Sequence, residues 1–360
     1  MKSESVLIDE FIAALASSPG VSAHLRAREV PVGKNERIDA LVEANVAGRQ
    51  LLMLVELKET AYPRDVRDAV WQLRTYQAHN PIAGQTQEVV PFIVAEAISP
   101  GARETLRSNG VGYFDRGGSL YVPTPGAFIF IDKPPPKSKA RVLGSIFMGR
   151  KAQVLKALFL RRGEWVSVKD IAASEGISPA PVSQTLTDLE RQDWVDVRGS
   201  GPGKLRRLVD SAGLLDAWAR FLLVQKPQPQ RRYFVSAGDK DFLLRRLAQS
   251  CEAHHATYAV TGEAAAQAYS PYLTSISQVL CRMPVGEPTN AVLEDLQARA
   301  VNEGWNLAII ESRSSGDFTH IEKIDGICFA SPLQVYLDLL QGQGRAKEMA
   351  EHLRREKLRA

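Results

Sequence analysis

SPAPVSQTLTDLERQDWVDVRGSGPGKLRRLV, residues 178–209, is the most informative stretch of this chain. Its first half predicts a helix. Ser178 can accept hydrogen bonds from the amides of the next turn, and Pro179 loses none at the first helical position. Three aliphatic residues then follow at spacings of four and three, which places them on one face: Val182, Leu186 and Leu189. The other faces of this helix carry short polar side chains.

The second half of the same stretch predicts a β-hairpin. Residues 194–198 have the composition of a strand, GSGPGK is a tight turn, and LRRLV is the return strand. Helices are predicted at 145–161, 168–175, 179–191 and 209–224, so the hairpin follows a third helix. This order is typical of a winged helix, in which the third helix enters the major groove and the hairpin holds the phosphate backbone.

This reading predicts a set of DNA contacts. We expect them from Ser178, Ser183, Gln184, Thr187 and Arg191 on the helix, and from Arg198, Lys204, Arg206 and Arg207 on the hairpin. Two alternatives remain open: a winged helix used only for protein contacts, and a plain three-helix bundle.

Two proline-rich basic segments divide the chain. The first is IDKPPPKSKARV at 131–142, and nine Lys or Arg and no acid lie between Lys133 and Gly163. We expect these charges to lie along DNA phosphates, the alternative being a solvated tether: Lys137, Lys139 and Arg141. With the second segment at 224–233, the expected division is 1–133, a linker at 134–145, 146–225 and 226–360.

The composition is that of a globular protein, with 44% hydrophobic and 24% charged residues. A net charge of +4 permits a nucleic-acid partner without arguing for one. The three cysteines are far apart in the sequence, which favours reduced thiols in a cytoplasmic protein: Cys251, Cys281 and Cys328. The amphipathic N-terminus does not resemble a signal peptide, and no apolar run of 18 residues is present, so we expect no membrane contact.

The first domain alternates predicted strands (36–46, 50–58, 89–95, 111–114, 119–123) with helices (5–18, 63–79, 99–109), which indicates a mixed α/β sheet. Leu54, Glu56 and Lys58 alternate onto one strand face, and Asp39 lies on the preceding strand. Two converging carboxylates beside a lysine are what a magnesium nuclease requires, because hard cations prefer oxygen ligands.

This arrangement resembles the PD-(D/E)xK nuclease superfamily over residues 1–130. The resemblance implies a restriction-endonuclease-like fold with Asp39, Glu56 and Lys58 as its triad, Asp39 and Glu56 holding Mg²⁺, and Gln72 and Tyr76 as the Q-x-x-x-Y helix. An acid from the opening helix would be Glu10. The sequence departs from the pattern because Ile38 stands where a proline precedes the aspartate.

Over most of its length the chain resembles the AbiEi-like antitoxins of type IV toxin–antitoxin systems. The motifs are YFDRGGSLYV (113–122), the stretch quoted above, YAVTGEAAAQAY (258–269) and PLQVYLDLLQGQGRAKEMAEHL (332–353). The resemblance implies a C-terminal mixed α/β effector domain, binding to promoter repeats in double-stranded DNA, repression of the protein's own operon, and a nucleotidyltransferase-like toxin encoded nearby.

We therefore expect a cytoplasmic transcriptional regulator with three domains of α/β and α+β class, and the sequence leaves its enzymatic activity open. One alternative is a Mg²⁺-dependent DNA endonuclease targeted by the winged helix; the other is a non-catalytic adaptor. The sequence leaves open whether the chain binds DNA as a homodimer on an inverted repeat or as a monomer.

Overall fold

The computed structural model describes residues 2–32, 37–79, 87–125, 129–133, 145–272 and 276–360. Its contacts divide the chain into two units. The first comprises Met1–Ile146 and Leu186–Asp196, and the second comprises Phe147–Thr185 and Val197–Ala360. The division passes through one helix, whose N-terminal half belongs to the second unit.

The first unit contains a seven-stranded sheet in which the strands follow one another in sequence order. The pairs β3–β4 and β4–β5 are parallel, and the other neighbours are antiparallel. The strands are β1 (Val21–Pro31), β2 (Arg37–Val46), β3 (Arg49–Ala61), β4 (Glu88–Ile98), β5 (Gly112–Asp115), β6 (Leu120–Val122) and β7 (Ile129–Ile131). The helices are α1 (Lys2–Ala16), α2 (Pro63–His79) and α3 (Pro100–Ser108).

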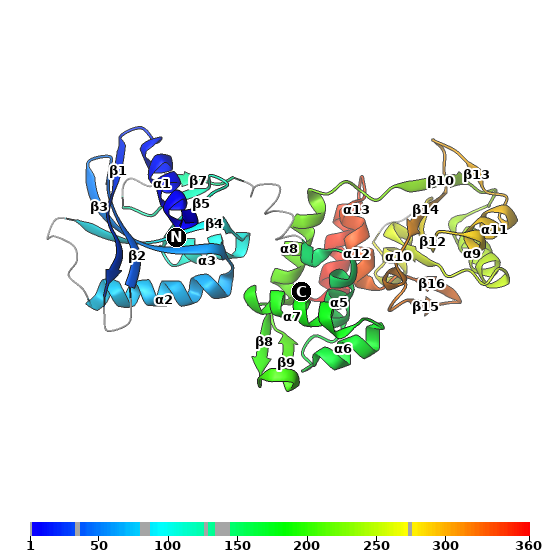
Figure 1. Cartoon of the computed structure of the whole chain (residues 1–360). Helices are drawn as coiled ribbons and strands as arrows, with labels where there is room; N and C mark the ends of the chain where they lie inside the picture. Colours follow the sequence, from blue (N-terminus) through cyan, green and yellow to red (C-terminus); the bar gives the residue numbers. More distant parts are fainter. Residues whose placement is uncertain (1, 33–36, 80–86, 126–128, 134–144, 273–275) are drawn as a thin grey trace. The chain divides into compact units, whose positions relative to one another are not determined.

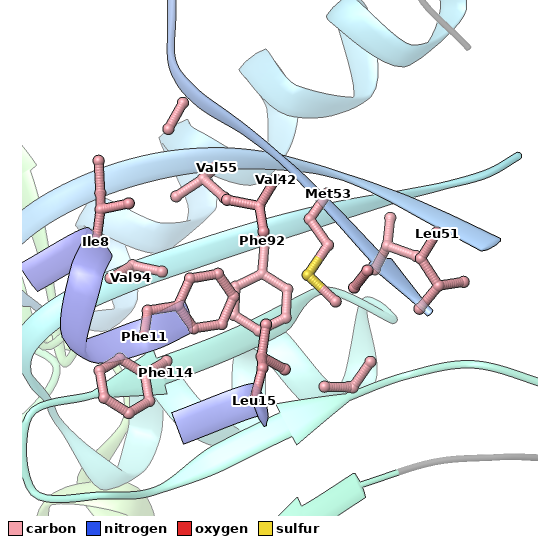
Figure 2. Close-up of a cluster of buried hydrophobic side chains, with 14 of the residues drawn as sticks. Ile8, Phe11, Leu15, Val42, Leu51, Met53, Val55, Phe92, Val94 and Phe114 are labelled. Carbon is pink, nitrogen blue, oxygen red and sulfur yellow. The ribbon is translucent and has the colours of Figure 1, made fainter. Parts of the chain in front are cut away.

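Helices cover both faces of this sheet (Figure 1). On one face, Phe11 and its neighbours from α1 pack against alternate residues of the strands, such as Val42, Met53 and Phe92 (Figure 2). On the other face, α2 and α3 pack against the intervening residues, among them Leu54. The mixed α/β sheet predicted from the sequence is therefore present.

Strands β1 and β7 were not predicted. Strand β1 pairs along its length with β2, yet its residues alternate between half-buried and exposed and include several charged side chains. An edge strand of this kind has no continuous apolar signal, because only one of its faces contacts the core. This segment is a strand because its backbone pairs with β2, and that pairing is not visible in the sequence.

The middle of the chain has the predicted order of elements. A short 3₁₀ turn, η1 (Ser145–Phe147), precedes α5 (Gly149–Leu160), α6 (Val168–Glu175), α7 (Pro179–Arg191), β8 (Val195–Arg198), β9 (Leu205–Leu208) and α8 (Ser211–Leu223). Strands β8 and β9 pair through the turn η2 (Gly201–Gly203). Val166 adds a further rung, because its backbone exchanges two hydrogen bonds of 2.9 Å with Arg206.

The C-terminal part is built on a second mixed sheet, in the order β13-β10-β14-β12-β11-β16-β15. The strands are β10 (Gln230–Phe234), β11 (Ala259–Thr261), β12 (Val279–Pro284), β13 (Arg299–Ala300), β14 (Leu307–Ser312), β15 (Glu322–Ile324) and β16 (Ile327–Phe329). The helices are α9 (Lys240–Ala253), α10 (Gly262–Tyr269), α11 (Glu287–Asp295), α12 (Pro332–Leu340) and α13 (Ala346–Leu353), with a 3₁₀ turn η3 (Ser315–Asp317) and a π-helical last turn η4 (Arg354–Leu358). The predicted helix near 239–254, the strand near 305–310 and the helix beginning near Pro332 are present.

Two chain-wide expectations can be compared with these described parts. None of their helices is both long and apolar enough to cross a membrane. The three cysteines are free thiols, and Cys251 and Cys281 are buried.

Candidate functional site

Helix α6 and the turn after it are fixed by local hydrogen bonds. Ser167 caps α6 by accepting from the Asp170 amide, and the Asp170 carboxylate accepts in return from the Ser167 backbone. This hydrogen bond lowers the pKa of Asp170 below its ordinary value. At the other end Gly176 adopts φ +62°, a left-handed conformation that favours glycine. The chain is thus turned sharply before α7 begins.

Helix α7 separates apolar from polar residues as predicted. Val182, Leu186 and Leu189 are fully buried. The residues expected to contact DNA are exposed, namely Ser178 at the turn and Ser183, Gln184, Thr187 and Arg191 along the helix. Their positions three and four residues apart give one continuous polar face, which is free of large apolar side chains.

The hairpin places its cations on two faces. Arg198 is exposed, Lys204 is half-buried, and the half-buried Arg207 lies over the Trp165 ring at 4.7 Å. Arg206 differs from the expectation, because it is only 6% exposed and its Nη1 donates to the Lys204 carbonyl oxygen. Successive residues of a strand point to opposite faces, so Arg206 and Arg207 cannot both lie outward. The predicted linker cations Lys137, Lys139 and Arg141 lie outside the described residues.

The first unit brings together the three polar residues predicted for a nuclease triad. Asp39 is on β2, and its Oδ2 accepts from the Leu57 amide of β3 at 2.7 Å. Lys58 Nζ donates to Glu56 Oε1 at 2.9 Å. The second oxygen of Glu56, Oε2, is buried without a hydrogen-bond partner in the described structure. An unsatisfied buried carboxylate oxygen is costly, and it is the part of this cluster that packing does not explain.

The pKa values of the two acids, Asp39 and Glu56, are both raised above their ordinary values. Burial raises the pKa of Asp39, although the hydrogen bond from Leu57 opposes the effect. Burial likewise raises the pKa of Glu56, which Lys58 lowers and the charge of Asp39 raises further. Asp39 therefore lies close enough to Glu56 for its charge to disfavour ionisation of that carboxyl group. A cation near them would relieve this repulsion.

The fit to a metal is partial. Asp39 and Glu56 supply the oxygen donors that Mg²⁺ prefers, and the unpartnered oxygen of Glu56 could serve as a ligand. No group of three or more His, Cys, Asp or Glu suited to a metal occurs among the described residues. Glu10 accepts from Arg116 at 2.8 Å, and Gln72 donates to the Tyr76 hydroxyl at 2.5 Å. The two residues of the Q-x-x-x-Y motif, Gln72 and Tyr76, therefore contact each other within α2.

Sequence reasoning missed a buried charge network in the second unit. Arg282 of β12 makes two hydrogen bonds to the Asp338 carboxylate of α12, at 2.9 and 2.5 Å. Lys156 of α5 lies 3.8 Å from Asp317, and Arg282 lies 3.8 Å from the same carboxylate. Lone charges inside apolar stretches were the available signal: VLKALFL, VLCRMP and VYLDLL.

Cavities flank this network on two sides. One, of about 350 Å³, is lined by residues such as Arg232, Glu263 and Trp305. The other, of about 510 Å³, is lined by α5 and α8 together with C-terminal elements. Both share the wall formed by Arg282 and Asp338.

Comparison with known proteins adds one finding. No curated protein and no solved structure matches the chain. A family model described as "Transcriptional regulator, AbiEi antitoxin, Type IV TA system" matches residues 207–359, which run from the end of the hairpin through α13 and its last turn. Over this C-terminal part, the chain is similar to the AbiEi transcriptional regulators that serve as antitoxins of type IV toxin–antitoxin systems.

Proposed function

We propose that this chain is a DNA-binding transcriptional regulator, an antitoxin-like protein that represses its own operon by gripping promoter repeats in double-stranded DNA. In this proposal the segment from α5 to β9 acts as a winged helix, with α7 in the major groove. The observation that carries it is the continuous exposed polar face of α7, followed in sequence by a glycine-tipped hairpin bearing cations. The family match at residues 207–359 supports the regulatory role.

The side chains on α7 suit base reading. Gln184 carries a donor and an acceptor in fixed geometry, which matches the edge of adenine, while Ser183 and Thr187 are short enough to let the helix approach the groove. Arg191, at the end of the helix, suits a phosphate. The buried stripe of Val182 and its neighbours holds the opposite face of the helix in place.

The hairpin supplies the contacts that do not depend on sequence. Arg198 is exposed, and the half-buried Arg207 places its guanidinium over the Trp165 ring. We assign Arg206 a supporting role instead, because its side chain is buried and its backbone joins β9 to Val166. Each phosphate contact contributes about 0.9 to the slope of log affinity against log salt.

A salt titration of DNA binding tests the proposal. Affinity for the chain's own promoter DNA is measured by fluorescence anisotropy, with the full chain and with Arg198→Gln, Gln184→Ala and the control Arg245→Gln, an exposed cation of α9. We expect Arg198→Gln to lower the salt slope by about 0.9, Gln184→Ala to change base preference, and the control to change neither. Unchanged operator binding in both test variants would refute the assignment.

The toxin partner follows from the same proposal. A nucleotidyltransferase-like reading frame beside this gene is expected, and a promoter between repeats should be repressed when this chain is expressed. Light scattering of the chain with operator DNA then determines whether it binds as a homodimer or as a monomer. A reporter that is not repressed would contradict the autorepression.

The nuclease-like cluster supports a second candidate, a Mg²⁺-dependent DNA endonuclease. Asp39 and Glu56 would hold the ion, which supplies charge to polarise a scissile phosphate and acidify water. Lys58 Nζ, now bonded to Glu56, would orient that carboxylate. The unpartnered Glu56 Oε2 is the observation in its favour.

A cleavage assay separates this candidate from an adaptor role. Plasmid is incubated with Mg²⁺ or Mn²⁺ and the full chain, Asp39→Ala, Lys58→Ala, or the control Glu59→Gln, an exposed neighbour on β3. A nuclease predicts cutting that survives only in the control and the parent chain. DNA association without cleavage, unchanged by Asp39→Ala, supports the adaptor.

A further inference from the structure

The cavity of about 510 Å³ in the second unit lies where α5 faces the C-terminal elements. Gln153 and Lys156 of α5 and Trp218 of α8 line it from one side. Arg282, Asp317 and Asp338 line it from the other side. Nothing in the proposed DNA contacts uses this space.

Lys156 is a buried cation in this wall whose hydrogen bonding is incomplete. Its side chain is 10% exposed, and its Nζ lies 3.8 Å from Asp317, beyond hydrogen-bond length. Within the described part of the chain no hydrogen bond to this ammonium is found. Burial lowers the pKa of Lys156, and the negative charge of Asp317 opposes that change. A buried ammonium with three donors and one loose partner is suited to an additional anion.

Two acceptors in the same wall, Asp338 and Gln228, are already used by hydrogen bonds. Asp338 Oδ1 accepts from Arg282 and Gln334, and its Oδ2 accepts from Arg282 and Thr261. Gln228 Oε1 accepts from Arg282 as well. Asp338 therefore has no acceptor to spare for Lys156, and an anionic ligand would compete with the Asp317 carboxylate for this ammonium.

The remaining surfaces define the rest of the ligand. Phe147 stacks on Trp218 with ring centroids 5.6 Å apart and contacts Phe221 at 5.4 Å, which gives the cavity an apolar side. Lys226 and Arg313 are exposed lining residues, whereas the nearby Glu311 is paired with Arg231. A compound with an anionic head and an apolar body matches both sides.

We propose that this cavity binds a small organic anion, a carboxylate or a phosphate ester with an apolar group, through the Lys156 ammonium, and that the ligand weakens DNA binding. The regulatory half of this inference rests on the proposed function. The binding half depends only on the cavity.

A physical connection runs from the cavity to the turn before α7. Asp317 and Gly316 belong to η3, and Gly316 packs so closely on Gln153 that an added Cβ would meet its Oε1 at 2.7 Å. Gln153 Nε2 donates to the Glu175 carbonyl at 3.1 Å, and His320 Nε2 lies 3.0 Å from Glu175 Oε1.

Glu175 is the last residue of α6, directly before the turn into α7. An anion on Lys156 would displace the Asp317 carboxylate. The η3 segment would then lose its ion pair with Lys156 of α5, and with it part of its connection to the end of α6.

Calorimetry on the full chain tests the binding half. Phenyl phosphate and benzoate are titrated in a buffer free of other organic anions, with benzyl alcohol as the neutral probe of similar shape. We expect one or both anions to bind and the alcohol not to, with Lys156→Gln weakening binding about tenfold. Arg313→Gln, at an exposed position, should weaken it less, and Lys323→Gln, an exposed lysine of β15, should not change it. Equal binding to the parent chain and to both cavity variants, or binding of the alcohol alone, would overturn the proposal.

Anisotropy with promoter DNA tests the regulatory half. A saturating anionic probe should weaken DNA binding by the parent chain and by Lys323→Gln, and leave Lys156→Gln unchanged. A probe that binds calorimetrically without changing DNA affinity overturns the regulatory coupling. If the chain binds no DNA under any condition, the proposed function fails, while calorimetry still decides whether the cavity takes an anion.

Discussion

Breaking the buried ion pair between Arg282 and Asp338 should destabilise the second unit strongly. Their side chains are 3% and 7% exposed, and two hydrogen bonds join them. Replacing Asp338 by Leu leaves the guanidinium with Gln228 and with Asp317 at 3.8 Å. A charge that is buried and no longer neutralised is the costly element of this variant.

The magnitude follows from that desolvation. Loss of one partner of a buried pair costs about 3–5 kcal/mol, whereas replacing both partners by apolar residues of similar size is close to neutral. For a unit of this size each kcal/mol shifts the unfolding midpoint by about 2–4 °C. Asp338→Leu should therefore lower the midpoint by about 6–20 °C. The double variant Arg282→Met with Asp338→Leu should recover most of it, short of the hydrogen bonds lost by Thr261 and Gln334.

A double-mutant cycle followed by circular dichroism measures this coupling. The matched control is the exposed pair Arg231–Glu311, with an N–O distance of 2.8 Å and side chains 54% and 36% exposed. There the coupling should be only about 0.2–1 kcal/mol. If Asp338→Leu costs no more than Glu311→Leu, or if the double variant is as unstable as the worse single one, the assignment of cost to an unneutralised buried charge is wrong.

Three further outcomes are expected. Glu56→Gln should stabilise the chain at pH 8, because the pKa of Glu56 is raised in the folded state and its ionisation therefore opposes folding. This penalty grows as the pH rises from the unfolded pKa of about 4.3 through the folded pKa, so the thermal melts of the variant and the parent chain should converge near pH 4. A variant that is less stable than the parent chain at pH 8 would contradict the reasoning. Ser167→Ala should cost about 1 kcal/mol in urea unfolding through loss of the cap on α6, and an unchanged midpoint would show that the cap is dispensable. A thiol reagent should label Cys328 alone in the native chain, because burial raises the pKa of Cys251 to about 12 and encloses Cys281; labelling of all three before unfolding would contradict this.

Local chemistry made much of the middle of the chain predictable. Helices α6 and α7 lie at the predicted positions 168–175 and 179–191, and the start of α7 follows from Ser178 and Pro179, which act on their immediate neighbours. The apolar stripe of α7 was visible from spacing alone. Capping and periodicity need only a few consecutive residues, so they can be read before the fold is known.

Neither the edge strands nor which of two neighbouring side chains becomes buried could be predicted from such local patterns. The sequence offers Arg206 and Arg207 as equal cations, but the pleat of β9 and its bond to Val166 bury the first and leave the second on Trp165. Strand β1 became visible only through its pairing with β2.

What the sequence by itself determined was therefore local: helix limits, the hairpin, and the alternation that puts Glu56 and Lys58 on one face of β3. Tertiary structure alone decided which distant groups meet. Asp39 reaches the Leu57 amide because β2 and β3 are paired, and Lys156, Arg282 and Asp338 line one cavity although far apart in the chain. Such meetings depend on long-range packing, because desolvation and pairing energies act over distances in space and not along the sequence.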